Sequence, residues 1–131
     1  MTEVGSLARE YAAITEHWSP RVVAVANGQY VKLAKVQGEF VWHAHAEEDE
    51  FFFVHKGRLT IRYRDGGAAV LGPGEFHVVP RGVEHQPFAA EETWIMLVEP
   101  AATRHTGEAE TPLTRSVAEQ TAHLAQSPSA E

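Results

Sequence analysis

Between Val22 and Glu99 the chain is divided into short, largely apolar stretches by turn-forming residues. The dividers are Asn27-Gly28, Gly38, Lys56-Gly57, Asp65-Gly66-Gly67, Gly72-Pro73-Gly74 and Pro80-Arg81-Gly82. Glycine and proline interrupt regular structure because glycine tolerates positive φ and proline fixes φ and lacks an N–H. A series of short strands separated by such turns predicts an antiparallel sandwich or barrel.

The stretches between these turns are candidate strands, at 22–26, 29–36, 39–45, 50–55, 58–63, 68–71, 75–79, 83–88 and 93–99. In the stretch 58–63, Leu59, Ile61 and Tyr63 alternate with polar residues, which indicates one buried and one solvated face. The stretch 93–99 is apolar on both faces, so its outer face should meet the N-terminal segment or another subunit. No internal repeat is visible, and one short barrel is expected.

The two ends of the chain have helical patterns instead. Residues 6–16 predict a short helix capped by Ser6, with Leu7, Tyr11 and Ile14 on one face. After Pro100 the strand pattern stops, and Ser116-Val117-Ala118-Glu119 matches a capping box for a brief helix to about Ala125. We therefore expect a helical segment at 1–20, a barrel at 21–100 and a C-terminal extension at 101–131.

The composition of the 131 residues excludes several kinds of site and partner. With no cysteine there are neither disulfides nor thiolate metal sites. A net charge of −7 argues against a nucleic-acid partner, since phosphate binding needs a basic surface. No signal peptide and no long apolar run are visible, so we expect a cytoplasmic protein without a membrane partner.

Among the eight histidines, His43 and His45 form a His-x-His pair followed by Glu50. If residues 39–45 form a strand, the two imidazoles point to the same face, and Glu50 returns on the next strand. A second cluster ends in His85, and Gly74, Pro80 and Gly82 allow tight corners that aim this residue back at the first cluster. Two nitrogens and a carboxylate suit a borderline divalent ion.

These residues and their spacing resemble the two motifs of the cupin superfamily. The first motif matches at Gly38, His43, His45, Glu50 and Gly57, and the second matches at Gly74, Pro80, Gly82 and His85. Two positions depart: Gly38 lies one residue nearer to His43 than in the family pattern, and Ala89 replaces the final asparagine. The resemblance covers about residues 30–99 and implies a jelly-roll β-barrel of six to eight strands. It also implies that His43, His45, Glu50 and His85 hold one divalent ion, which could be Zn, Mn, Fe or Ni.

Other residues near the motifs are candidates for further roles. His77 precedes the turn that carries His85 and is the best unassigned candidate for a proton shuttle. Tyr63 shares the inward face of its strand and lies in the core or lines the pocket. His55 falls on the face opposite Glu50 and is not expected to bind metal. The acidic run 47–49 is a solvated turn, or one of its members orients a ligand histidine.

Three kinds of chemistry fit such a site on a small-molecule ligand with oxygen donors. The first is redox-neutral isomerase or cyclase chemistry with the metal as Lewis acid, as in the sugar isomerases and zinc-dependent polyketide cyclases to which this chain is similar in length and motif. The second is dioxygenase or decarboxylase chemistry, and the third is non-catalytic binding or sensing. We favour the first, and we expect a homodimer because cupins commonly dimerise.

Overall fold

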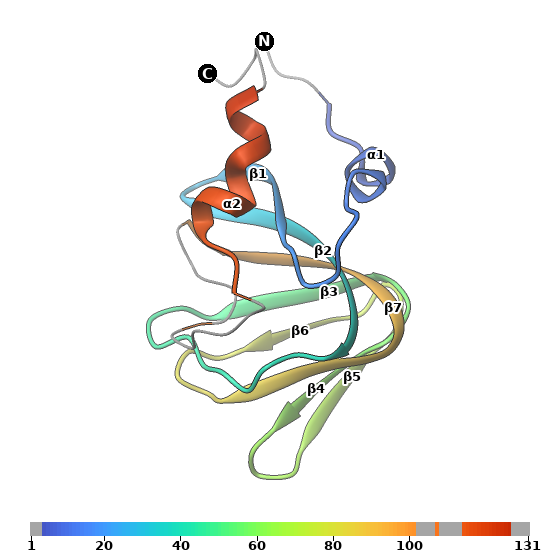
Figure 1. The fold of residues 1–131 in the computed structure, drawn as a ribbon. Helices are drawn as coiled ribbons and strands as arrows, with labels where there is room; N and C mark the ends of the chain where they lie inside the picture. The colour runs from blue at the N-terminus through green and yellow to red at the C-terminus, as the bar shows by residue number, and fades with distance from the viewer. Residues whose placement is uncertain (1–3, 102–106, 108–113, 127–131) are drawn as a thin grey trace.

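The computed structural model of the chain describes residues 4–101, 107 and 114–126. Figure 1 shows a rolled sheet with the helices at one end and the β4–β5 hairpin at the other. The elements are α1 (Leu7–Ala12), β1 (Arg21–Ala26), β2 (Gln29–Glu39), β3 (Glu50–Lys56), β4 (Leu59–Tyr63), β5 (Ala68–Leu71), β6 (Phe76–Val79), β7 (His85–Pro100), α2 (Val117–Thr121) and the 3₁₀ helix η1 (Ala122–Gln126).

All paired strands are antiparallel, in the order β1-β2-β7-β3-β6, and β4 pairs with both β5 and β7. The long strand β7 joins the two halves of the roll. Its first residues pair with β4, and its last residues lie between β2 and β3. The ladders of the described strands do not close into a ring. The predicted all-β, antiparallel jelly-roll fold is confirmed, as an open roll.

Two of the predicted strand boundaries are wrong. Residues 40–45 do not continue a strand: pairing with β7 resumes after a register shift between Val36 and Gly38, and β2 then ends at Glu39. Beyond that point the Phe40 N–H donates to the Pro87 carbonyl at 2.9 Å, and an isolated bridge joins His43 to His85. The stretches predicted at 83–88 and 93–99 belong to the single strand β7, since residues 90–92 bulge opposite Gln37 without breaking it.

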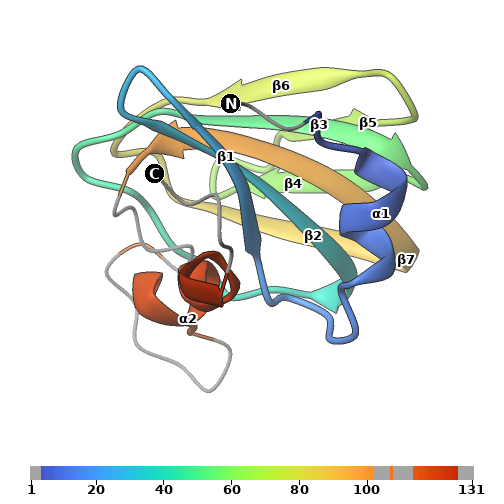
Figure 2. The same cartoon turned by 90° about the horizontal axis from the view of Figure 1, so that it is seen from above.

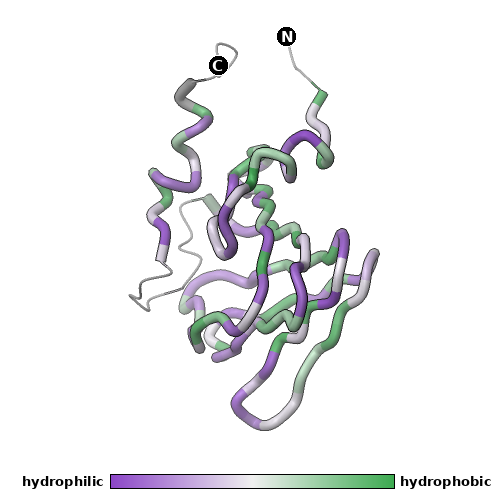
Figure 3. Tube along the Cα trace, turned by 45° about the vertical axis from the view of Figure 1, so that its right-hand side comes forward, coloured by the Kyte–Doolittle hydropathy of each residue, from purple (hydrophilic) through white to green (hydrophobic). Residues whose placement is uncertain are grey.

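Alternation along the strands places apolar side chains inside the roll, and Figure 3 shows hydrophobic and hydrophilic residues alternating along the strands. On β4, for example, Leu59 and Ile61 are fully buried. The main core combines side chains from both halves of the roll: Trp18, Ala34, Val36, Phe40, Phe52, Val54, Leu59, Ile61, Leu71, Val79, Ala89, Ile95 and Leu97.

The helix α1 covers the outer face of β2 and β7. Ser6 caps it as predicted and accepts from the Arg9 N–H at 3.3 Å, but the helix ends at Ala12 rather than at residue 16. Tyr11 packs with Leu33 in a second small core, and its hydroxyl donates to the Ile95 carbonyl at 2.7 Å. The outer face of residues 93–99 is thus covered in part by the N-terminal segment, which was one of the two expected partners.

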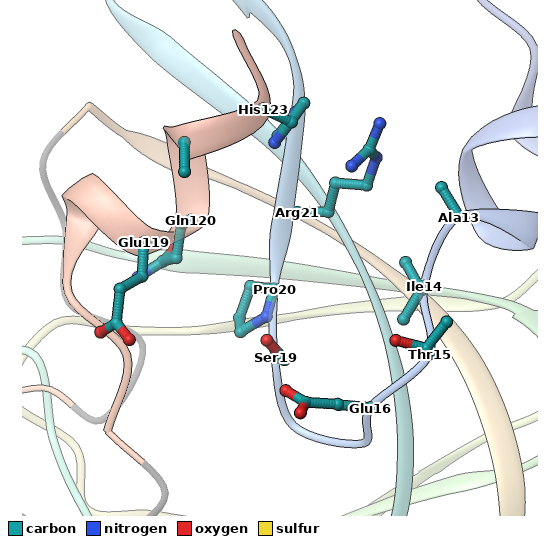
Figure 4. Close-up of a pocket in the computed structure, with 11 residues that line it drawn as sticks. Ala13, Ile14, Thr15, Glu16, Ser19, Pro20, Arg21, Glu119, Gln120 and His123 are labelled. Atoms are coloured by element: carbon teal, nitrogen blue, oxygen red, sulfur yellow. The ribbon is translucent and has the colours of Figure 1, made fainter. Parts of the chain in front are cut away.

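The second helix, α2, begins with the predicted capping box between Ser116 and Glu119, and η1 continues it to Gln126. Figure 2 shows α1 and α2 on either side of β1, and Figure 4 shows His123 of η1 beside the strand that begins at Arg21. His123 attaches this end, with its Nε2 2.6 Å from the Val22 carbonyl oxygen. None of the helices in the described parts of the chain is long and apolar enough to cross a membrane.

Candidate metal centre

The four residues expected as ligands come from three places in the fold. His43 and His45 lie on the irregular segment after β2, Glu50 is the first residue of β3, and His85 is the first residue of β7. Paired backbone bonds join the strands at this point: the His43 N–H donates to the His85 carbonyl at 3.0 Å, and the His85 N–H donates back at 2.9 Å. The segment holds its geometry through this bridge rather than through a regular strand.

The four side chains converge inside the roll. Their exposed fractions are 5% for His43, 4% for His45, 2% for Glu50 and 0% for His85. One potential ligand atom from each residue lies within 4.8 Å of all the others. This arrangement matches what four ligands around a single ion require.

Backbone carbonyls fix the tautomers of two of the imidazoles. His43 Nδ1 lies 2.9 Å from the Val41 oxygen, and His85 Nδ1 lies 3.0 Å from the Val83 oxygen. A carbonyl only accepts, so Nδ1 of each ring carries the hydrogen and Nε2 keeps its lone pair. Each Nε2 is therefore in the state that binds a metal, and each ring is held in place from behind.

The inward-facing nitrogen and oxygen atoms of this cluster are buried without hydrogen-bond partners. Nε2 of His43, His45 and His85 and Oε1 of Glu50 find no hydrogen-bond partner among the described residues. A buried polar atom without a partner costs roughly 1–3 kcal/mol. Four such atoms around one point fit a divalent cation, which would satisfy them together.

The electrostatics of the cluster favour an ionised Glu50 and a neutral His43. Burial would raise the pKa of Glu50, but His45 and His85 hold it well below its usual range. Burial and the nearby His85 lower the pKa of His43 to about 4. For His45, burial alone would lower the pKa, but Glu50 overcomes burial and raises it. This effect acts over the 3.3 Å between His45 Nε2 and Glu50 Oε1.

Comparison with known proteins agrees with this arrangement. The family described as Cupin domain matches residues 29–100, which is more than half of the chain. The chain is a cupin. In Bacillus subtilis (strain 168), uncharacterized protein YdbB is 34% identical over 77 residues, covering 59% of this chain and 68% of that protein.

Solved structures extend the likeness to the fold. A cupin-2 domain containing protein from Shewanella frigidimarina is 48% identical, with a TM-score of 0.72, and the match covers 74% of this chain and 94% of that one. Hydroquinone 1,2-dioxygenase from Sphingomonas sp. TTNP3, solved with 4-hydroxybenzoate bound, is 17% identical, with a TM-score of 0.60 and coverage of 76% and 80%. The second likeness shows the fold alone.

Two further residues of the cupin interior form a pair, as the sequence allowed but did not establish. The Tyr63 hydroxyl lies 2.7 Å from His77 Nε2. Tyr63 is the cross-strand partner of His85, and His77 is the partner of Phe52, so both sit on the inner face beside the cluster. Burial, with help from Asp65, raises the pKa of Tyr63.

The remaining predicted residues lie outside the cluster. His55 is exposed and stacks on Tyr11, with ring centroids 5.3 Å apart, as expected for the face opposite Glu50. In the acidic turn, Glu48 Oε1 lies 3.8 Å from His45 Nδ1, which is longer than a hydrogen bond. Asp49 accepts from the Arg81 N–H at 2.8 Å and ties the two motifs together.

Sequence analysis missed a buried ion pair beside the cluster. Lys32 Nζ lies 3.0 Å from Glu99 Oε1, and the two side chains are 0% and 1% exposed. The ammonium also donates to Gln120 Oε1 of α2 at 2.6 Å. Burial and the neighbouring Glu50 raise the pKa of Glu99 to about 8, while Lys32 opposes the rise. The missed signal was alternation, because Lys32 occupies an inward position of β2 and Glu99 an inward position of β7.

Proposed function

We propose that this cupin holds one divalent ion with His43, His45, Glu50 and His85 and acts on a small, carbonyl-containing molecule by redox-neutral isomerase or cyclase chemistry. The observation that carries the proposal is the set of four buried, unsatisfied ligand atoms around one point. When bound, the ion would act as a Lewis acid that polarises a carbonyl oxygen.

The charges of the chain suit a neutral or anionic oxygen donor. Glu50 contributes one negative charge, and the three imidazoles bind as neutral ligands, so a divalent ion keeps a net charge of about +1. The nearby Glu99 has Lys32 Nζ 3.0 Å from its Oε1, so the two side chains together add no net negative charge beside the ion. Zn, Mn, Fe and Ni all accept this donor set.

The Tyr63–His77 pair is the proposed proton-transfer group. With 2.7 Å between the hydroxyl and Nε2, a proton can pass between the two side chains without large motion. Both lie on the same inner face as His85, so a ligand at the metal would have this pair beside it. His77 would accept a proton from the ligand, and Tyr63 would keep the imidazole in position.

Metal analysis is the first test. Protein produced without a histidine tag is expected to hold about one divalent ion per chain. His85→Ala should lose the ion, whereas His55→Ala, which removes an exposed histidine, should retain it. Absence of bound metal, together with no uptake of added Zn²⁺, Mn²⁺, Fe²⁺ or Ni²⁺, would refute the proposal.

Proton exchange tests the reaction class. The zinc-loaded protein should speed exchange of the acetylacetone methylene protons with D₂O, as followed by NMR, and Tyr63→Phe and His77→Gln should slow this exchange.

The second candidate is dioxygenase chemistry, which uses the same four ligands and is favoured by the fold shared with hydroquinone 1,2-dioxygenase. Oxygen uptake by the iron-loaded protein with hydroquinone would favour it. If neither reaction occurs but acetate binds only to the metal-loaded form, a binding or sensing role is favoured.

We also propose that the cupin works as a homodimer in the cytoplasm. Phe76 and Val78 on β6 are 67% and 45% exposed, and Phe76 stacks on Phe51 of β3 on the outer face of the roll. Exposed apolar residues grouped in this way are typical of an interface. Light scattering at micromolar concentration should give a dimer, and Phe76→Ser should shift it towards the monomer.

A further inference from the structure

A small cavity lies against the candidate metal centre. It reaches His43 and Glu50, is otherwise lined by apolar and aromatic side chains, and has a volume of about 30 Å³. A cavity of this size has room for only one or two water-sized groups. Any ligand that enters from this side must therefore be short, or must displace part of the wall.

Trp18, together with Pro20, forms the part of this wall that comes from outside the roll. It belongs to the connection between α1 and β1, where Glu16 and His17 are exposed, yet its own side chain is only 8% exposed. The indole stacks on Phe40 with centroids 4.4 Å apart, and Phe40 meets the His43 ring edge-on at 5.5 Å. The two rings of Trp18 and Phe40 thus connect the outer segment between α1 and β1 with the proposed metal ligand His43.

The backbone of Trp18 is held in an uncommon conformation. Its φ is 59°, a left-handed value that is unusual for a bulky residue and is maintained only where surrounding contacts enforce it. Two bonds to the backbone of β2 do so: the Trp18 N–H donates to the Lys35 carbonyl, and Nε1–H donates to the Gln37 carbonyl, each at 2.9 Å. The indole is thus fixed relative to the roll and limits the cavity.

We propose that Trp18 determines ligand specificity in this cupin, by limiting what reaches the metal to compounds with an oxygen donor and an apolar part of only a few heavy atoms. This inference rests on the proposed metal site. Acetate-sized carboxylates and carbonyl compounds fall within the limit, and aromatic acids exceed it. Hydrophobic pockets discriminate by roughly 10–200-fold for each methylene that does not fit.

The test uses the cobalt-loaded protein, whose visible absorption reports ligand binding at the ion directly. Acetate should bind the natural protein at least about tenfold more tightly than benzoate, and Trp18→Leu should improve benzoate binding about tenfold or more with little change for acetate. Trp94→Leu is the matched control, since this indole packs on Tyr11 outside the roll, and it should leave the acetate-to-benzoate ratio unchanged.

The outcomes separate this inference from the proposed function. If Co²⁺ gives no spectrum of a bound ion, the metal site itself is refuted. If the cobalt spectrum is normal but Trp18→Leu leaves the ratio unchanged, or if benzoate already binds the natural protein as tightly as acetate, the role of Trp18 is refuted. Should Trp18→Leu fail to fold, Trp18→Phe replaces it as the test variant, because it keeps an aromatic side chain in the wall but a smaller one. It should shift the acetate-to-benzoate ratio in the same direction by a smaller factor.

Discussion

Replacement of Gly57 by alanine should destabilise the protein strongly. Gly57 lies in the turn between β3 and β4 with φ at +99°, where an L side chain is strained. A Cβ there would lie 2.5 Å from Thr93 Oγ1 and 2.8 Å from Thr93 Cα. The second contact is with backbone, so rotation of a side chain cannot relieve it.

The magnitude follows from these two effects. Left-handed backbone costs a non-glycine residue about 1–2 kcal/mol. Overpacking against the Thr93 backbone adds about 1–3 kcal/mol, so we expect a loss of about 2–5 kcal/mol. Thr93 also accepts from the Arg58 N–H at 3.1 Å, and displacing Thr93 would disturb this bond as well. Gly74 is the matched control, because its φ is +82° but a Cβ there would meet nothing within 4 Å.

Urea unfolding of both variants after metal removal gives the comparison. Gly57→Ala should lose clearly more free energy of unfolding than Gly74→Ala, which should lose only the roughly 1–2 kcal/mol of backbone strain. Equal losses would show that the approach to Thr93 relaxes without cost, and the packing argument would be wrong.

Three other predictions address the residues around the centre. Because the folded-state pKa of Glu99 is raised to about 8, the folded protein keeps a proton that the unfolded chain loses above its usual pKa. The contribution of the Glu99 carboxyl to the stability of the metal-free protein should thus fall as pH rises towards about 8. In Glu99→Gln the urea midpoint should decline less over this pH range. Lys32→Met leaves the Glu99 carboxyl and the Gln120 amide oxygen buried without the ammonium that both contact, and should cost about 1–3 kcal/mol for each group in the same assay, whereas Arg64→Ala, in an exposed pair with Glu84, should cost less than about 1 kcal/mol; similar losses would contradict this. A Cβ at Gly107 would overlap the Ala44 carbonyl between two ligand histidines, so Gly107→Ala should weaken zinc binding about 10–100-fold by calorimetry, and Gly66→Ala, with φ at +96° but open space around it, should not.

Spacing predicted which residues form the cluster better than it predicted the backbone that carries them. His43 and His45 were expected to share a face through strand alternation, yet they lie on an irregular segment and converge through the bridge to His85. The spacing of the motif constrains where the side chains converge, and more than one backbone conformation can bring them there. Glu50 matches the expectation fully, as the first residue of β3.

The residues that sequence analysis missed depend on contacts between distant segments. Lys32 is an ordinary strand lysine until its register places it inside the roll, next to a carboxylate on β7. Trp18 lies in a connecting segment, where residues are usually exposed, and nothing local indicates that its indole inserts beside Phe40. Tyr63 and His77 were each candidates from the sequence, but their contact with one another depends on how the strands β4 and β6 are placed in the roll.

The bond from Gln120 to Lys32 has a consequence for how such chains vary. The cupin match ends at residue 100, yet an amide from beyond that limit solvates an ammonium in the interior of the roll. A relative that kept the barrel but exchanged its tail would leave this cation short of an acceptor. We therefore expect the residue type at position 32 to vary together with the sequence of the C-terminal segment. A chain truncated after the barrel should be destabilised in the interior of the roll, around Lys32, rather than only near the truncation.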